Sequence, residues 1–292
     1  MHDHTHHNSQ SSNRIGWAFV LNVSFTLIEF VGGILTNSTA IMADAVHDLG
    51  DSLSIGSAWV LSRMAQKGAD SSFTYGYKRF SLLGALINGL VLIAGSAWVL
   101  AQAIPRLSDP VMPEVEGMLM LAILGVCVNG FAAWKLSAGE TLNERVLNWH
   151  LLEDVLGWVA VLIVSITLMF VELPMLDALL AMGFTLYVLA NVARNTILAI
   201  KLFLQATPEK GLIERVRKEL LAFEDIVSIH HEHAWSLDGD SSVYTAHLVL
   251  RDLPSVAEQL KLKNEIARTL EPFKFAHTTI EFEFPEEKCR DD

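Results

Sequence analysis

The stretch Ala43-Asp-Ala-Val-His-Asp-Leu-Gly-Asp51 places a histidine and an aspartate four residues apart inside a largely apolar segment. A later stretch, His150-Leu-Leu-Glu-Asp154, repeats this spacing in a second apolar segment. Residues four apart lie on one face of an α-helix, so each segment presents an imidazole beside a carboxylate. Together they offer a ligand set suited to a tetrahedral divalent metal such as zinc: His47, Asp51, His150 and Asp154.

Both stretches lie in segments long enough to cross a bilayer as helices. The chain has six apolar runs that approach or exceed the roughly 20 residues needed, at residues 16–36, 40–62, 80–104, 116–136, 148–170 and 175–200. The composition agrees, because 51% of the residues are hydrophobic and 18% are charged, whereas soluble domains carry about 25% charge. The sequence therefore predicts an α-helical membrane protein with six transmembrane helices.

Ionisable side chains at membrane depth are costly, and they usually mark ion pathways or proton relays. Helical periodicity also places Asp44, Asp48 and Glu153 on the same faces as the four residues above. Periodicity alone thus leaves a wider set of candidates than the four. The competing interpretation is that these side chains extend to water at the helix ends or pair with one another. Matching polar faces in two separate spans favour a pathway for a transition-metal ion.

The charged residues that flank the membrane at the ends of the runs indicate how the chain is oriented in it. One side carries most of the basic residues: Arg14, Arg63, Lys67, Lys78, Arg79, Lys135, Arg145, Arg194 and Lys201. The other side carries Arg106 among acidic residues: Asp109, Glu114, Glu116, Glu172 and Asp177. By the positive-inside rule, we expect both termini in the cytoplasm, and we expect the membrane to be the cell inner (plasma) membrane.

A different pattern begins after Thr207-Pro208. The remaining segment carries more charged residues than the much longer part before it, which favours a soluble domain. The pattern predicts a helix from residue 212, strands at 226–236 and 242–250, a helix at 254–270 and a strand at 277–284. This αββαβ order predicts a three-stranded sheet with two helices on one face. We therefore expect a His-rich cytoplasmic tail at 1–14, a transmembrane domain at 15–206 and a cytoplasmic α+β domain at 207–292.

Net charge and cysteine content exclude several classes of function. The formal net charge of −12 argues against a nucleic-acid partner and suits the attraction of cations. The two cysteines, Cys127 and Cys289, form no CxxC motif, so the sequence predicts neither a disulfide framework nor a cysteine metal site. The 11 histidines are divided among the N-terminal tail, the two membrane segments and the C-terminal domain.

Five motifs resemble those of the cation diffusion facilitator family, in particular its bacterial zinc, cobalt and cadmium efflux transporters. They are Glu29-Phe-Val-Gly-Gly33, residues 43–51, Tyr75-Gly-Tyr-Lys-Arg79, residues 150–154 and His230-His-Glu-His-Ala-Trp235. The resemblance covers nearly the whole chain, and the paired His-x-x-x-Asp motif is specific. It implies a homodimeric zinc/proton antiporter whose cytoplasmic domain is ferredoxin-like and binds metal. It also implies that His47, Asp51, His150 and Asp154 form the transport site.

Ligand chemistry predicts how such a site exports metal. Zinc binding requires neutral imidazoles and ionised carboxylates, so metal and protons compete for the same groups. The reference pKa of imidazole, about 6.5, lies within the working pH range. An inward proton gradient is therefore expected to drive metal outward. The mixed imidazole and carboxylate set favours Zn²⁺, with Cd²⁺, Co²⁺ and Ni²⁺ as further candidates, whereas an all-carboxylate site would favour harder ions such as Mn²⁺.

Histidines on the predicted strands form a second candidate site. His233 and His247 lie on adjacent strands, and His277 shares its parity with Glu283 on the third. These groups are expected to meet at a face or edge of the sheet and bind a regulatory metal. The resemblance supports all four, and His230 and His231 are further candidates outside that set. The alternative is an ordinary solvated strand face. The loop at 66–77 contains no histidine, so a loop metal site known in some relatives is not expected here.

Two other functions remain open on the sequence. An intramembrane metallohydrolase would carry a Glu beside a ligand His in an HExxH-type motif, which neither His47-Asp48 nor His150-Leu151 supplies. A membrane-anchored metal sensor would explain the cytoplasmic histidines, but it gives no reason for paired ligands within two spans. The sequence therefore predicts a proton-coupled metal transporter and not an enzyme.

Overall fold

The computed structural model describes residue 20 and residues 22–65, 67–137 and 142–291. The His-rich tail predicted at 1–14 lies outside these residues. The chain divides into two compact units. One consists of Met1–Trp59 and Ile87–Thr196, and the other consists of Val60–Leu86 and Ile197–Asp292.

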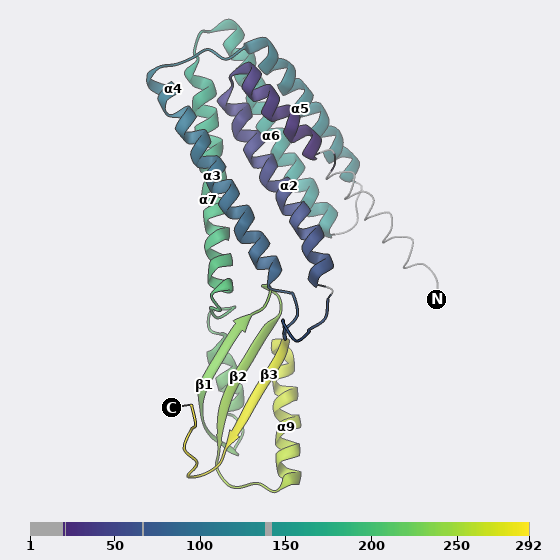
Figure 1. The fold of residues 1–292 in the computed structure, drawn as a ribbon, viewed down its shortest axis with the longest axis vertical. Coiled ribbons are helices and arrows are strands. Elements are labelled where there is room, and N and C mark those ends of the chain that lie inside the picture. Colours follow the sequence, from purple (N-terminus) through teal and green to yellow (C-terminus); the bar gives the residue numbers. More distant parts are fainter. Residues whose placement is uncertain (1–19, 21, 66, 138–141, 292) are drawn as a thin grey trace, which may run out of the picture. The chain divides into compact units, whose positions relative to one another are not determined.

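Long apolar helices form the membrane domain (Figure 1). In the described part of the chain they are Asn22–Thr36, α2 (Thr39–Ala65), α3 (Phe80–Ala103), α5 (Val115–Leu136), α6 (Leu142–Phe170) and α7 (Met175–Phe203), with the short α4 (Pro105–Ser108) after α3. Among the described residues, four stretches are long and apolar enough to cross a membrane: Phe80–Ser108, Val115–Lys135, Leu151–Phe170 and Met175–Phe203. With 27 residues, α2 extends about 40 Å, and it carries the acidic face predicted from the sequence. The predicted α-helical membrane fold is confirmed.

The helical bundle has a buried interior and an apolar exterior. Its buried side chains include large apolar residues from several helices: Phe25, Ile41, Val99, Met118 and Trp158. Many leucine, isoleucine and phenylalanine side chains on the same helices are exposed, and Phe170 is 82% exposed. An exposed apolar surface on helices of this length is suited to contact with lipid tails.

Two glycines of α3 permit close contacts with neighbouring helices. A Cβ atom at Gly89 would lie 2.2 Å from Oγ1 of Thr196 in α7, and one at Gly95 would lie 2.6 Å from a methyl group of Val46 in α2. Because the bilayer provides no hydrophobic driving force between helices, such close packing is a main source of their association. The absence of a side chain at Gly89 and Gly95 therefore permits close packing of α3 against α7 and α2.

A carboxylate of α7 caps the start of α2. Asp177 accepts hydrogen bonds from Ser38 Oγ (2.5 Å), from Thr39 N and Oγ1 (both 2.7 Å) and from Ala40 N (3.2 Å). These amides belong to the first turn of α2, where N–H groups lack partners within the helix and a negative charge is favoured. Asp177 is 1% exposed. From the sequence, Asp177 is only one of several acidic residues on one side of the membrane. In the fold its hydrogen bonds link α7 to the start of α2.

Removing this cap should destabilise the bundle. Asp177→Ala leaves buried amides without acceptors, so we expect the free energy of unfolding to fall by about 2–4 kcal/mol. The measurement is the thermal unfolding midpoint of the purified chain in detergent. Asp177→Asn retains one acceptor oxygen and should lower the midpoint less, and Asp109→Ala, at an exposed position, serves as the control. Equal midpoints for Asp177→Ala and Asp109→Ala would show that the cap does not stabilise the bundle.

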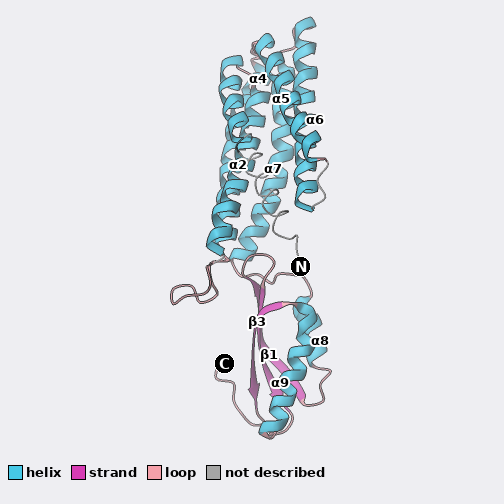
Figure 2. Cartoon of the chain, turned by 90° about the vertical axis from the view of Figure 1, so that its right-hand side faces the viewer, coloured by secondary structure: helices cyan, strands magenta, loops and turns pink. Residues whose placement is uncertain are grey.

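The C-terminal domain has the predicted αββαβ order. Its elements are α8 (Leu212–Leu220), β1 (Ile226–Ser236), β2 (Ser242–Leu250), α9 (Val256–Leu270) and β3 (Phe275–Glu283), with a 3-10 turn at Glu271–Phe273. The central strand, β2, is antiparallel to β1 and parallel to β3. Figure 2 shows both helices on one side of the sheet. Apolar residues are buried between the helices and the sheet, among them Val216, Leu220, Tyr244, Leu248 and Ile266.

Candidate metal centres

The membrane domain brings together three of the four residues predicted for the transport site. The Nε2 atom of His47 in α2 lies 3.6 Å from Oδ2 of Asp51 and 3.9 Å from Oδ1 of Asp154 in α6. The side chains of His47 and Asp154 are 16% and 4% exposed. His150 lies in α6 one turn before Asp154, but its side chain lies outside the described part of the structure. The contact between α2 and α6 therefore assembles an imidazole and two carboxylates.

These separations are close to those of ligands that share one ion. Bonds of about 2.0–2.2 Å to a tetrahedral zinc place neighbouring ligand atoms about 3.4 Å apart. The observed 3.6 and 3.9 Å are only a few tenths of an ångström wider.

Neighbouring polar groups of the wider candidate set occupy different surroundings. Asp48 is buried and offers an oxygen within 4.8 Å of ligand atoms of His47 and Asp51, although its carboxyl group also contacts that of Glu29. Asp44 lines a cavity of about 350 Å³ between α2, α6 and α7. Glu153 is exposed. Glu153 therefore lies away from the site, whereas Asp48 is an alternative to Asp154 as a carboxylate ligand of the metal.

A second cluster of ligands lies on the face of the sheet that the helices leave uncovered. Glu283 Oε1 lies 2.8 Å from His247 Nδ1 and 3.1 Å from His230 Nε2, and Cys289 Sγ lies 3.5 Å from His247 Nδ1. These four residues offer ligand atoms that all lie within 4.8 Å of one another. Two nitrogens, one oxygen and one sulfur are donors that zinc accepts in tetrahedral sites.

A β-bulge explains why His230 joins this cluster. The register pairs His230 with His247 and His233 with Thr245, so β1 has one more residue than β2 between these pairs. His231, at the bulge, has a φ of +47°, which is uncommon for a residue other than glycine. As a result the rings of both His230 and His231 approach that of His247, with centroid distances of 5.5 and 5.1 Å.

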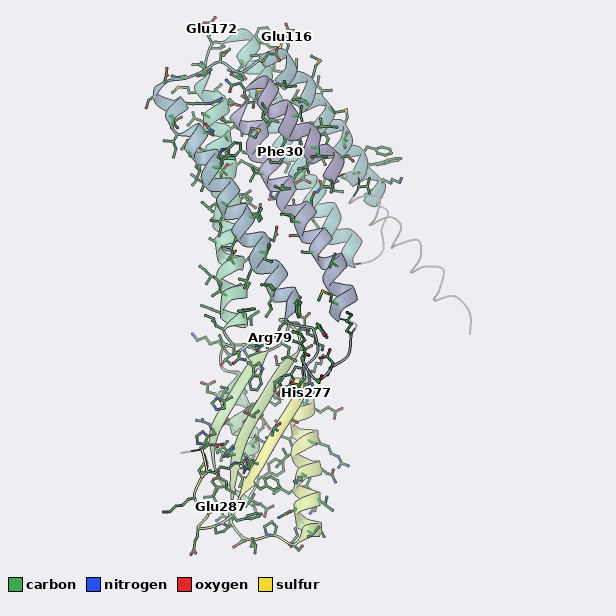
Figure 3. The ribbon with its side chains drawn as sticks, in the orientation of Figure 1. Phe30, Arg79, Glu116, Glu172, His277 and Glu287 are labelled. Atoms are coloured by element: carbon green, nitrogen blue, oxygen red, sulfur yellow. The ribbon has the colours of Figure 1, made fainter. Side chains whose placement is uncertain are left out.

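The predicted cytoplasmic set needs correction at two positions. His233 and His277 lie on the same face as His247 and Glu283, but they are displaced along the strands. The register pairs His277 with Val243 and Glu283 with Val249, a separation of about 20 Å at 3.3 Å per residue. The ring of His277 packs against Tyr75 instead, with centroids 5.2 Å apart, at the end of the sheet near Arg79 (Figure 3).

Cys289 belongs to this cluster of candidate ligands, although the sequence predicted no cysteine metal site. Its position depends on the segment after β3, which turns back toward β2. Arg290 Nη2 donates to Glu281 Oε2 at 2.5 Å, and Asp291 Oδ2 lies 3.6 Å from His247 Nε2. No periodicity extends into this segment, so the sequence carries no signal that would return the thiol to the sheet.

The surroundings of Glu283 favour the ionised form of its carboxyl group, which is the form that binds a cation. Burial alone would raise the pKa of its carboxyl group, but hydrogen bonds with His247, Cys289 and His230 outweigh that effect and hold the pKa below its usual value. An ionised carboxylate beside two imidazoles and a thiol is the state in which such a site binds a divalent metal.

Comparison with known proteins agrees with this architecture. The family model of the cation efflux transmembrane domain matches residues 17–202, and that of the cation efflux protein cytoplasmic domain matches residues 208–284. The chain is 32% identical to a cadmium, cobalt and zinc/H(+)-K(+) antiporter of Bacillus subtilis over 96% of this chain and 91% of that protein. It is 30% identical to the zinc transporter ZitB of Pectobacterium atrosepticum, over 100% of this chain and 91% of that protein.

A further relative is the metal cation efflux system protein CzcD of Cupriavidus metallidurans, with 30% identity over 97% of this chain and 89% of that protein. The two family models together cover most of the chain in the expected order. They describe transport proteins and neither enzymes nor sensors, so the predicted resemblance is confirmed. The chain belongs to the cation efflux family, also called the cation diffusion facilitator family, and is a metal-cation efflux transporter of the membrane.

Proposed function

We propose that this protein exports Zn²⁺ from the cytoplasm in exchange for protons, with His47, Asp51, His150 and Asp154 as the transport site. The observation that carries the proposal is the convergence of His47 and Asp51 with Asp154 between two membrane helices. The named substrates of the relatives support zinc and make Cd²⁺ and Co²⁺ further candidates, and ligand chemistry adds Ni²⁺.

Competition between metal and protons provides the coupling. A carboxylate or imidazole that binds zinc cannot hold a proton on the same atom, so loading of the metal releases protons and protonation releases the metal. If the site opens alternately to the two sides of the membrane, protons that enter from outside drive zinc outward.

The orientation of the chain sets the direction of export. The excess of Lys and Arg on one side supports cytoplasmic termini and insertion in the inner (plasma) membrane. We propose a His-rich tail at 1–14, a transmembrane domain at 15–206 and a cytoplasmic domain at 207–292 that binds metal and joins two copies of the chain as a homodimer. The match of residues 208–284 to the family's cytoplasmic domain supports this assignment.

Vesicles reconstituted with the purified chain and loaded with a zinc-sensitive dye test the proposed function. A transporter should accumulate zinc in the dye compartment without any other protein when protons can leave the vesicle. A membrane-anchored sensor would bind zinc without moving it. Binding of zinc with no accumulation above protein-free vesicles would contradict the proposal.

The cytoplasmic cluster is proposed as a regulatory metal site. His230, His247, Glu283 and Cys289 would hold the ion. Of the four residues that the resemblance supports, His247 and Glu283 remain in this cluster. The four donors suit Zn²⁺, and the cluster lies on a sheet face where a bound ion would tie the C-terminal segment to β2 and β3.

Substitutions in this cluster should remove one class of bound zinc. His247→Ala deletes the residue that contacts both Glu283 and Cys289, so zinc binding at this site should weaken by about 100-fold, and Cys289→Ser should weaken it by about tenfold. The measurement is a competition titration with a chromophoric chelator on the full chain. His233→Ala is the matched control, because its ring lies outside the cluster. Loss of the same zinc in His233→Ala but not in His247→Ala would contradict the assignment.

A further inference from the structure

A cavity lies where the loop between α2 and α3 meets the end of α7 and the first strand of the C-terminal domain. Its volume is about 500 Å³, and its lining includes Tyr75, Lys78, Arg79, Phe203 and Trp235. The apolar spans that begin at Phe80 and end at Phe203 both terminate beside it. The cavity therefore lies at a boundary between hydrocarbon and water.

The charge of this cavity is opposite in sign to that of the chain as a whole. The protein has a net charge of −12, yet Lys78 and Arg79 line the cavity and no described Asp or Glu residue does. The ammonium group of Lys78 donates to the hydroxyl group of Ser241 at 2.9 Å. With the Gln205 side-chain amide turned so that its oxygen faces Arg79, this oxygen accepts from the two terminal nitrogens of the Arg79 guanidinium group at 3.0 and 3.2 Å. Ser241 in turn donates to Asp238 Oδ2 at 3.0 Å, so a carboxylate lies behind the partner of Lys78, whereas the partner of Arg79 is a neutral amide. The charge of Arg79 is therefore the more available of the two to an anion.

The remaining lining is aromatic and apolar. Phe73, Tyr75 and Phe203 are 42%, 44% and 43% exposed, and Leu83 continues the lining along α3. Aromatic side chains with a polar end gather at the level of lipid headgroups, and exposed apolar side chains below them suit acyl chains. Two cations beside an apolar lining are complementary to a molecule that is anionic at one end and apolar at the other.

The loop that forms one wall is held in a defined shape. Asp70 accepts hydrogen bonds from the Tyr77 hydroxyl group at 2.7 Å and from the Ser72 and Phe73 amides at 2.8 Å, and these bonds hold the pKa of its carboxyl group below the usual value. Tyr75 packs against Trp235 of β1 with centroids 6.3 Å apart. The cavity is thus preformed by contacts within the compact unit that consists of Val60–Leu86 and Ile197–Asp292.

We propose that this cavity binds one anionic glycerophospholipid of the leaflet that faces the C-terminal domain. The phosphodiester lies between Lys78 and Arg79, where charge-assisted hydrogen bonds to a phosphate are strongest, and the acyl chains follow Leu83 and Phe203. A zwitterionic lipid binds less well, because its ammonium group finds no carboxylate in the lining. The bound lipid joins the loop, α7 and the sheet at one point.

The test is native mass spectrometry of the full chain in detergent, titrated with short-chain phosphatidylglycerol or with phosphatidylcholine of the same chain length. We expect about tenfold tighter binding of phosphatidylglycerol. Arg79→Gln should remove most of that preference, whereas Arg79→Lys should retain it. Both variants lack the guanidinium group that contacts Gln205, so their difference reports the charge. Lys201→Gln, a basic residue in the last turn of α7 outside the cavity lining, should bind both lipids like the unmodified chain.

Three results would overturn the proposal: equal binding of the two lipids, equal loss of preference in Arg79→Lys and Arg79→Gln, or loss of preference in Lys201→Gln. Inorganic phosphate at the same concentration distinguishes a lipid from a soluble anion. If phosphate alone displaces phosphatidylglycerol, the cavity is an anion site and the lipid assignment fails. Elution volume and thermal midpoint confirm that each variant is folded.

Discussion

Asp154→Ala and Asp51→Ala should each reduce zinc transport in reconstituted vesicles to the level of protein-free vesicles. Changes to groups that only orient a metal ligand cost about 10–100-fold, so loss of a ligand itself should cost at least about 100-fold. The effect should be largest for Asp154, because its 4% exposure leaves little water to replace the missing oxygen. The initial rate of dye response at saturating zinc measures the effect.

Asp48→Asn is the control that tests the choice of ligands. Asp48 lies beside His47 in the sequence and offers an oxygen near the same site, but its carboxyl group also contacts Glu29. We expect Asp48→Asn to lower the initial rate of zinc transport about tenfold, because a residue that only orients the ligands contributes less than a ligand itself. If Asp48→Asn lowered the transport rate more than Asp154→Ala, the metal would bind nearer to Glu29. That result would contradict the proposed set of four ligands.

The proton gradient is expected to set the direction of zinc movement. Each pH unit across the membrane supplies about 1.4 kcal/mol per proton. Vesicles that are acidic inside should therefore concentrate zinc against its gradient, and vesicles that are alkaline inside should lose preloaded zinc. A protonophore should abolish uphill movement and leave only equilibration. Potassium is held equal on both sides, because one relative is named as an antiporter that also involves K⁺.

Uphill accumulation that persists after the pH gradient is collapsed would contradict proton coupling while leaving the metal site intact. Accumulation that requires a potassium gradient instead would assign the coupling to a different ion. Asp154→Ala serves as the control in both gradients, since it should respond to neither.

The structure also indicates how far sequence reasoning extends in this chain. The membrane helices and the strands at 226–236 and 242–250 were predictable because their patterns are local: continuous apolar runs in the first case and alternation bounded by a turn in the second. The pairing of His47 with Asp51 is local as well, since it follows from helical spacing. The approach of Asp154 to His47 depends on the packing of α2 against α6, which no spacing determines.

The cytoplasmic site shows where such reasoning fails. Strict alternation places His233, His247, His277 and Glu283 on one face, which is correct, but it gives no position along the strands. The extra residue between His230 and His233 then decides which imidazole lies opposite His247. Cys289 enters only because the chain turns back after β3. The sequence likewise indicated only that Asp177 is one of several acidic residues on one side of the membrane, whereas in the fold its carboxylate caps the start of α2.

The most direct test of the central claim is the position of the metal itself. The measurement is an anomalous-scattering map at the zinc absorption edge, from crystals of the full chain grown with Zn²⁺. The account predicts a peak within about 2.0–2.2 Å of His47, Asp51, His150 and Asp154. A membrane-domain peak coordinated by Asp48 or Asp44 without Asp154, or no peak between α2 and α6, would contradict it.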